Sequence, residues 1–163
     1  MTLALFLLLL KIFSFKTPII RIGFEELPIL FTGFFLGPLW GIAAGGLSDI
    51  IGVLVNGGKF FPGFTVSAIL VGVIPGVFHI LYRKEFKYLS LLGIVALTQV
   101  LTSVLLNTLW LDMMGYGTFM IMLPGRILEQ LVLIPLYTTI ILLLDKKSRN
   151  THTLHADRLA KIK

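Results

Sequence analysis

Residues 119–144, FMIMLPGRILEQLVLIPLYTTIILLL, form an apolar run in which Arg126 and Glu129 are the only charged side chains. At 1.5 Å per residue, a helix of this length exceeds the ~30 Å hydrocarbon core of a bilayer. The run 89–111, LSLLGIVALTQVLTSVLLNTLWL, contains no charge at all and is also long enough to cross. These two stretches predict transmembrane helices, so lipid is the expected solvent for much of the surface.

The overall composition supports this reading. Hydrophobic residues make up 56% of the 163 and charged residues 13%, against roughly a quarter charged in a soluble domain. The net charge is +6, but the basic residues lie beside apolar runs rather than among aromatics, which argues against nucleic-acid binding. Because there is no cysteine, disulfides, thiolate metal sites and cysteine nucleophiles are excluded.

Loops with proline, glycine or charge divide the chain into apolar segments, each read as a helix. We therefore predict an all-α integral membrane protein, a compact bundle of six transmembrane helices forming one domain over residues 1–145. The third helix is expected to be short, either a bent continuation of the second or buried in protein. The expected segments are 1–15, 27–45, 47–56, 64–82, 88–112 and 119–144.

Lysine and arginine in the loops predict the orientation. Residues 82–87 carry three basic side chains, and the tail 146–163 carries six, so both are expected in the cytoplasm. With six crossings the N-terminus is also cytoplasmic. Loops near residues 15–27, 55–62 and 112–118 then face outward, where a ligand would arrive.

Polar side chains at membrane depth mark candidate functional residues, because burying a charge in hydrocarbon is costly. Arg126, Glu129 and Gln130 fall at i, i+3 and i+4, so they share one face of the last helix. A site for a polar ligand would explain them. So would an Arg126–Glu129 or interhelical ion pair that only holds the bundle together.

The preceding helix carries a second polar row, Gln99, Ser103, Asn107 and Trp110, at helical spacing. Asn107 can donate and accept hydrogen bonds, as reading the edge of a heteroaromatic ring requires, and Trp110 offers a stacking plane. An ordinary interhelical hydrogen bond would account for Asn107 equally well.

Two further features of the first half favour structural roles. Gly33, Gly37, Gly41 and Gly45 recur every four residues, a spacing that lets another helix approach the backbone closely. A docking surface for a partner helix is the alternative. Asp49 follows Gly45-Gly46-Leu47-Ser48 and is expected to be a helix N-cap.

The segment 56–65, NGGKFFPGFT, places three phenylalanines in an expected outer loop. They could anchor at the bilayer interface. They could also form a lid over an aromatic ligand, with Lys59 or Arg21 meeting its carboxylates.

Two other classes of function fit less well. A membrane enzyme would need a nucleophile with a base or a metal site, but His79 lies near the inner end of its helix and the other histidines, His152 and His155, are in the tail. We therefore expect no catalytic residue, no metal and no cofactor. A small self-sufficient secondary transporter would predict paired repeats with interrupted helices, for which the short third segment is weak support.

Several motifs resemble, in order, those of the substrate-binding (S) components of energy-coupling-factor (ECF) vitamin transporters, in particular the folate family. The stretch 61–68, FPGFTVSA, is similar to a segment of that family. Three further stretches match in the expected order: 21–29, 33–49, and 107–110 followed by 124–128. The resemblance covers most of residues 18–135.

This resemblance implies a high-affinity subunit in a prokaryotic cell membrane that captures folate outside and delivers it inward. A transmembrane coupling subunit and two ATPases would be its partners, which agrees with the absence of a phosphate-binding loop motif here. A related S component for another vitamin is the alternative. The residues expected to bind substrate are Arg126, Asn107, Trp110 and Gln130 at the pterin end, Phe61, Gly63, Phe64 and Thr65 as a cover, and Arg21 and Lys59 at the carboxylates.

Overall fold

The computed structural model describes residues 15–16, 21–22, 26–56, 60–81 and 87–160. These residues are helical apart from turns and two very short strands, β1 (Phe15–Lys16) and β2 (Arg21–Ile22), which pair antiparallel. The helices are α2 (Leu27–Leu36), α3 (Pro38–Asn56), α4 (Pro62–Leu81), α5 (Tyr88–Gln99), η1 (Val100–Leu106), α6 (Asn107–Met113) and α7 (Phe119–Ala160).

Four of the described helical spans are long and apolar enough to cross a membrane, which supports a multi-pass membrane protein. They are Pro38–Val55, Pro62–Leu81, Tyr88–Met113 and Phe119–Asp145. Helix α2 is a shorter apolar helix. Residues 1–14 of the expected first helix lie outside the described part, so the count of six remains a prediction.

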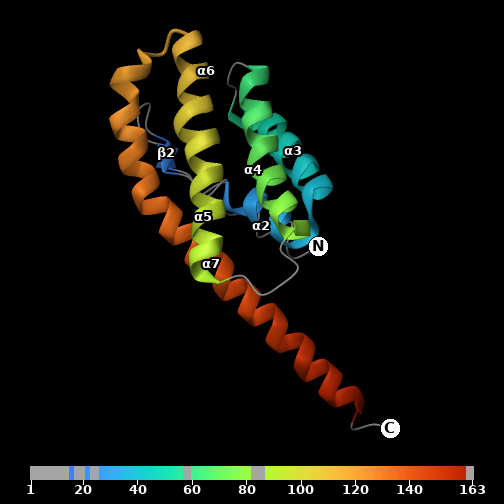
Figure 1. Cartoon of the computed structure of the whole chain (residues 1–163). Helices are drawn as coiled ribbons and strands as arrows, with labels where there is room; N and C mark the ends of the chain where they lie inside the picture. Colours follow the sequence, from blue (N-terminus) through green and yellow to red (C-terminus); the bar gives the residue numbers. More distant parts are fainter. Residues whose placement is uncertain (1–14, 17–20, 23–25, 57–59, 82–86, 161–163) are drawn as a thin grey trace.

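The described helices form two groups (Figure 1). Helices α2, α3 and α4 pack together, while α5, η1 and α6 follow one another as a continuous rod beside α7. The two groups meet through contacts of α4 with α5, η1 and α6. Their common core includes Leu30, Val71, Val95 and Tyr137, all of them almost fully buried.

The expected boundary between the second and third helices is wrong. The break falls at Gly37, whose φ of 91° is readily adopted only by glycine, and Pro38 opens α3 because its missing N–H costs nothing at a helix start. Helix α3 therefore has 19 residues rather than about ten, and α2 is the short one with 10. The sequence between Gly45 and Leu47 is uninterrupted helix.

The glycine row allows α3 and α4 to pack backbone to backbone. A Cβ on Gly41 or Gly45 would collide with the backbone of Gly72 or Ala68, and a Cβ on Gly33 would collide with Gly72. The predicted close approach is thus confirmed for three of the four glycines, although they belong to two helices. Gly37 makes the turn instead.

Helix α7 extends well beyond the bundle (Figure 1). It runs from Phe119 to Ala160 without a break, past the predicted domain end at residue 145. A helix of this length measures about 63 Å, roughly twice the hydrocarbon core. The division into a membrane domain and a basic tail stays a prediction.

Candidate binding site

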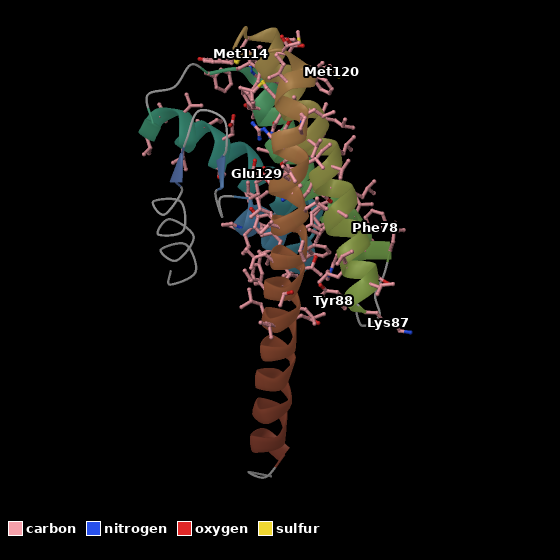
Figure 2. The ribbon with its side chains drawn as sticks, turned by 90° about the vertical axis from the view of Figure 1, so that its left-hand side faces the viewer. Phe78, Lys87, Tyr88, Met114, Met120 and Glu129 are labelled. Atoms are coloured by element: carbon pink, nitrogen blue, oxygen red, sulfur yellow. The ribbon has the colours of Figure 1, made fainter. Side chains whose placement is uncertain are left out.

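The two predicted polar rows lie at the same depth. Asn107 begins α6, six residues before its end at Met113, and Arg126 lies seven residues after the start of α7 at Phe119. Because α6 and α7 are in contact and joined by a short turn, both side chains lie about 10 Å below that end of the bundle. Figure 2 shows Glu129, one turn further along α7, between the end marked by Met114 and Met120 and the end marked by Tyr88 and Lys87.

Buried polar atoms without a protein partner gather in this region. Arg126 is 8% exposed and Gln130 is 4% exposed, yet Arg126 Nε and Gln130 Oε1 make no hydrogen bond to any described residue. The same holds for Asn107 Oδ1 on the facing helix. Leaving such a group buried and unpaired costs about 1–3 kcal/mol. A polar ligand that supplied the missing partners would remove this cost.

An aromatic cluster begins one helical turn beyond Asn107, with Trp110 on α6. The Trp110 indole donates from Nε1 to Ser67 Oγ at 3.1 Å, which joins α6 to α4. The Phe61 ring lies 5.8 Å from that of Trp110 and 5.9 Å from that of Phe64, measured between centroids. Gly63 is pressed against Trp110, since a Cβ there would lie 2.6 Å from the indole Cδ2. The glycine lets the α4 backbone approach the indole.

The segment that was expected to be a loop is largely helical. Pro62 is the first residue of α4, so Gly63, Phe64 and Thr65 form its first turn. Only Phe60 and Phe61 remain in the described part of the connection. Proline favours this start because its φ is already helical. A cover over the site would therefore be the end of a helix rather than a flexible lid.

Asp49 is not the helix cap that was expected. It lies within α3, and its carboxylate accepts a 2.6 Å hydrogen bond from Thr65 Oγ1 in the first turn of α4. The expectation was wrong because the third helix was predicted to start at residue 47, nine residues after its observed start at Pro38. Asp49 thus ties one predicted site residue, Thr65, to the neighbouring helix.

A π-helical segment separates the two halves of the polar row. In η1 the N–H of Asn107 reaches the carbonyl of Thr102, five residues earlier. Segments of this kind are rare and occur often at functional sites. Ser103, within η1, donates to Glu26 Oε1 at 2.7 Å and lies 3.2 Å from Gln99 Oε1. Glu26 was not predicted as a partner of Ser103, because it stands at the edge of an expected outer loop.

The expected carboxylate-binding residues are not tested. Arg21 belongs to β2, where it pairs with Lys16 through the backbone. Lys59 lies outside the described residues. No group of three or more histidine, cysteine, aspartate or glutamate side chains that could hold a metal occurs within the described part of the chain.

Comparison with protein families identifies the class to which this architecture belongs. A family model described as "ECF transporter, substrate-specific component" matches residues 1–144. The chain belongs to this family. Its members are the substrate-specific subunits of transporters, so the expected S-component resemblance is confirmed and an enzyme is the wrong class.

Individual relatives of this S component carry a more specific name. A protein of Clostridium novyi named "Folate transporter FolT" is 33% identical over 132 residues, covering 80% of this chain and 76% of the relative. A protein of Leuconostoc mesenteroides with the same name is 24% identical over 143 residues, covering 84% and 77%. A solved structure titled "Crystal structure of FolT bound with folic acid" matches with a TM-score of 0.75 and 25% identity, covering 90% of this chain and 93% of that one.

Proposed function

We propose that this S component binds folate with high affinity at the outer side of a prokaryotic cell membrane and delivers it inward. The observation that carries the proposal is the set of unpaired atoms on Asn107, Arg126 and Gln130, with Trp110 one turn beyond Asn107 on the same helix. A flat heteroaromatic ring with donors and acceptors along its edge complements such a set. The names of the relatives favour folate among such ligands.

Each residue then has a chemical task. Trp110 and Phe61 provide stacking surface for the pterin ring. Arg126 Nε donates to a ring acceptor, while Asn107 Oδ1 and Gln130 Oε1 accept from ring N–H groups. Gly63, Phe64 and Thr65 close the site from the start of α4. Arg21 and Lys59 remain the candidates for the glutamate carboxylates.

The energy for transport would come from other chains. As an S component, this chain would work with a transmembrane coupling subunit and two ATPases, and it would need no cofactor of its own. We also propose six transmembrane helices in all, the first within residues 1–15, with both termini cytoplasmic.

Equilibrium binding to the detergent-purified chain tests the proposal. Folic acid is titrated while intrinsic fluorescence is recorded, with riboflavin, thiamine and pantothenate as controls. Trp110 lies in the proposed site, whereas Trp40 is 62% exposed on α3 and serves as a distant reporter. We expect saturable nanomolar quenching by folic acid alone, retained in Trp40→Phe.

The controls separate two kinds of failure. Saturable binding of another vitamin in place of folic acid would retain an S component and discard folate as its substrate. Flux of folate into vesicles that contain this chain without ATPase partners would contradict the dependence on a coupling module and favour a self-sufficient transporter.

A further inference from the structure

We infer that the Thr108 hydroxyl is a further substrate-binding group, which hydrogen-bonds the polar edge of the ligand ring next to Asn107 and Arg126. This inference rests on the proposed function, because it adds a contact to the same site. Thr108 was not among the residues expected to bind substrate, since a threonine inside a helix can satisfy its hydroxyl with a carbonyl of its own helix.

Thr108 is the exception among the helical threonines whose side chains the structure describes. Five of them donate from Oγ1 to the backbone carbonyl oxygen four residues earlier, at 2.7 or 2.8 Å: Thr32, Thr98, Thr102, Thr138 and Thr139. Thr65 donates to Asp49 instead. Thr108 is completely buried, yet its Oγ1 makes no hydrogen bond to any described residue. A hydroxyl buried in this way needs a partner from elsewhere.

The π-helical segment explains why Thr108 lacks the usual partner. The carbonyl four residues before Thr108 belongs to Val104, which lies within η1. There the N–H of Asn107 reaches back to Thr102, five residues earlier, so the turn before Thr108 is wider than that of an α-helix. A side chain that follows a widened turn is not placed over the carbonyl four residues earlier. The rare backbone geometry therefore leaves this hydroxyl available to a ligand.

The position of Thr108 around α6 directs it toward α7. Trp110 faces α4, because its indole donates to Ser67. Thr108 is two residues earlier and lies about 160° away around the helix, and Asn107 falls between the two. Helix α6 packs against both α4 and α7, so a buried side chain on the side opposite Ser67 lies toward α7.

Thr108 also lies at the depth of the proposed site. It is five residues before the end of α6 at Met113, about 8 Å below that end, and Arg126 on α7 lies about 10 Å below it. Arg126 Nε can only donate and Asn107 Oδ1 can only accept, whereas a hydroxyl can do either. Thr108 can therefore pair with a ring donor or a ring acceptor, whichever stands beside the atoms that the other two bind.

The test compares Thr108→Val with Thr138→Val. Valine replaces the hydroxyl by a methyl group, and Thr138 on α7 is equally buried but donates its hydroxyl to the carbonyl of Ile134. Each variant, purified as the full chain, is titrated with folic acid, and its melting temperature is measured without ligand.

We expect Thr108→Val to weaken folic acid binding about 5- to 10-fold while its melting temperature is unchanged or higher, because the hydroxyl it removes has no partner in the unliganded chain. Thr108→Ser keeps the hydroxyl and should bind folic acid within about 3-fold of the unmodified chain. Thr138→Val should leave the affinity unchanged.

Three results would overturn the inference while the proposed function stands. Unchanged folic acid affinity in Thr108→Val would show that the hydroxyl does not contact the ligand. Equally weak binding by Thr108→Ser and Thr108→Val would assign the loss to packing. A lower melting temperature for Thr108→Val than for Thr138→Val would mean that the hydroxyl has a partner within the protein. If the unmodified chain did not bind folic acid, the proposed function and this inference would fall together.

Discussion

The interface between α3 and α4 and the interface between α6 and α7 use opposite chemistry. At the first, Gly41, Gly45 and Gly72 bring two backbones into direct contact, and the hydrogen bond from Thr65 to Asp49 pairs its polar side chains within the protein. At the second, buried polar atoms of Asn107, Arg126 and Gln130 have no described partner. The first interface is complete as it stands, whereas the second lacks hydrogen-bond partners.

This contrast indicates how a small membrane protein can hold a ligand site without losing its fold. Close helix packing in lipid relies on van der Waals contact between small residues, so it tolerates almost no added volume. A ligand site instead leaves hydrogen-bonding capacity unused until the ligand arrives. We therefore expect mutations in the first interface to change stability and mutations in the second to change affinity.

The largest effect is expected from Gly45→Ala. Its Cβ would overlap the Ala68 carbonyl oxygen, so α3 and α4 would have to separate, at a cost of about 3 kcal/mol or more. Gly46→Ala is the matched control, since its Cβ would meet only the Ile69 side chain at 3.9 Å. Thermal unfolding in detergent should show a large loss for the first and little change for the second. Equal melting temperatures would contradict the backbone contact.

Arg126→Ala should reduce folic acid affinity by about 100-fold while leaving the melting temperature nearly unchanged. The side chain is buried with Nε unpaired, and a charge-assisted hydrogen bond contributes about 1.5–3 kcal/mol. Arg126→Lys keeps the charge but loses the planar fork, so its affinity should recover only in part. If Arg126→Ala bound folic acid as tightly as the unmodified chain, Arg126 would not be a binding residue.

Trp110→Phe should weaken folic acid binding by about 1 kcal/mol and abolish most of the ligand-induced quenching. Phenylalanine retains a stacking ring but loses the 3.1 Å hydrogen bond to Ser67 that orients it. Ser67→Ala removes the same hydrogen bond and keeps the indole, so it should reduce affinity without loss of quenching. Full quenching in Trp110→Phe would mean that Trp40, and not Trp110, reports ligand binding.

The smallest effect is expected from Thr65→Val, which removes the 2.6 Å hydrogen bond to Asp49. Interhelical hydrogen bonds in bilayers contribute about 0.6 kcal/mol on average, so unfolding should shift only slightly. A double-mutant cycle with Asp49→Ala, which removes the acceptor, measures the coupling, and Thr65→Ser should preserve it. A coupling near zero would mean that Asp49 and Thr65 act independently.

The sequence predicts the class and the polar rows because both follow from one-dimensional patterns. Apolar length identifies the spanning helices, and helical spacing places Asn107 with Trp110 and Arg126 with Gln130. The break at Gly37 was missed because glycine at four-residue spacing is also typical of a continuous packed helix. That error displaced Asp49 from mid-helix to a cap position.

The contact made by Glu26 and the π-helical segment could not be predicted from the sequence, for a different reason. The contact between Glu26 and Ser103 spans 77 residues, and no local pattern links them. The sequence 100–106, VLTSVLL, gives no sign of a widened turn, because its residues suit an ordinary α-helix as well. Such features depend on how the whole bundle packs.

The π-helical segment gives chain length an effect that differs along the same rod. Each residue of an α-helix turns the chain by about 100° and advances it by about 1.5 Å. A π-helical turn closes over five residues where an α-helical turn closes over four, so deleting one residue from Val100–Leu106 would convert it to an α-helical turn and leave Asn107 and Trp110 oriented as before relative to Gln99. Deleting Thr108 or Leu109 in α6 has no such turn to absorb it, and Trp110 would rotate by about 100° relative to Asn107. The extra residue of the π-helical turn is therefore the one place in this rod where the chain can be shortened without turning the indole away from α4.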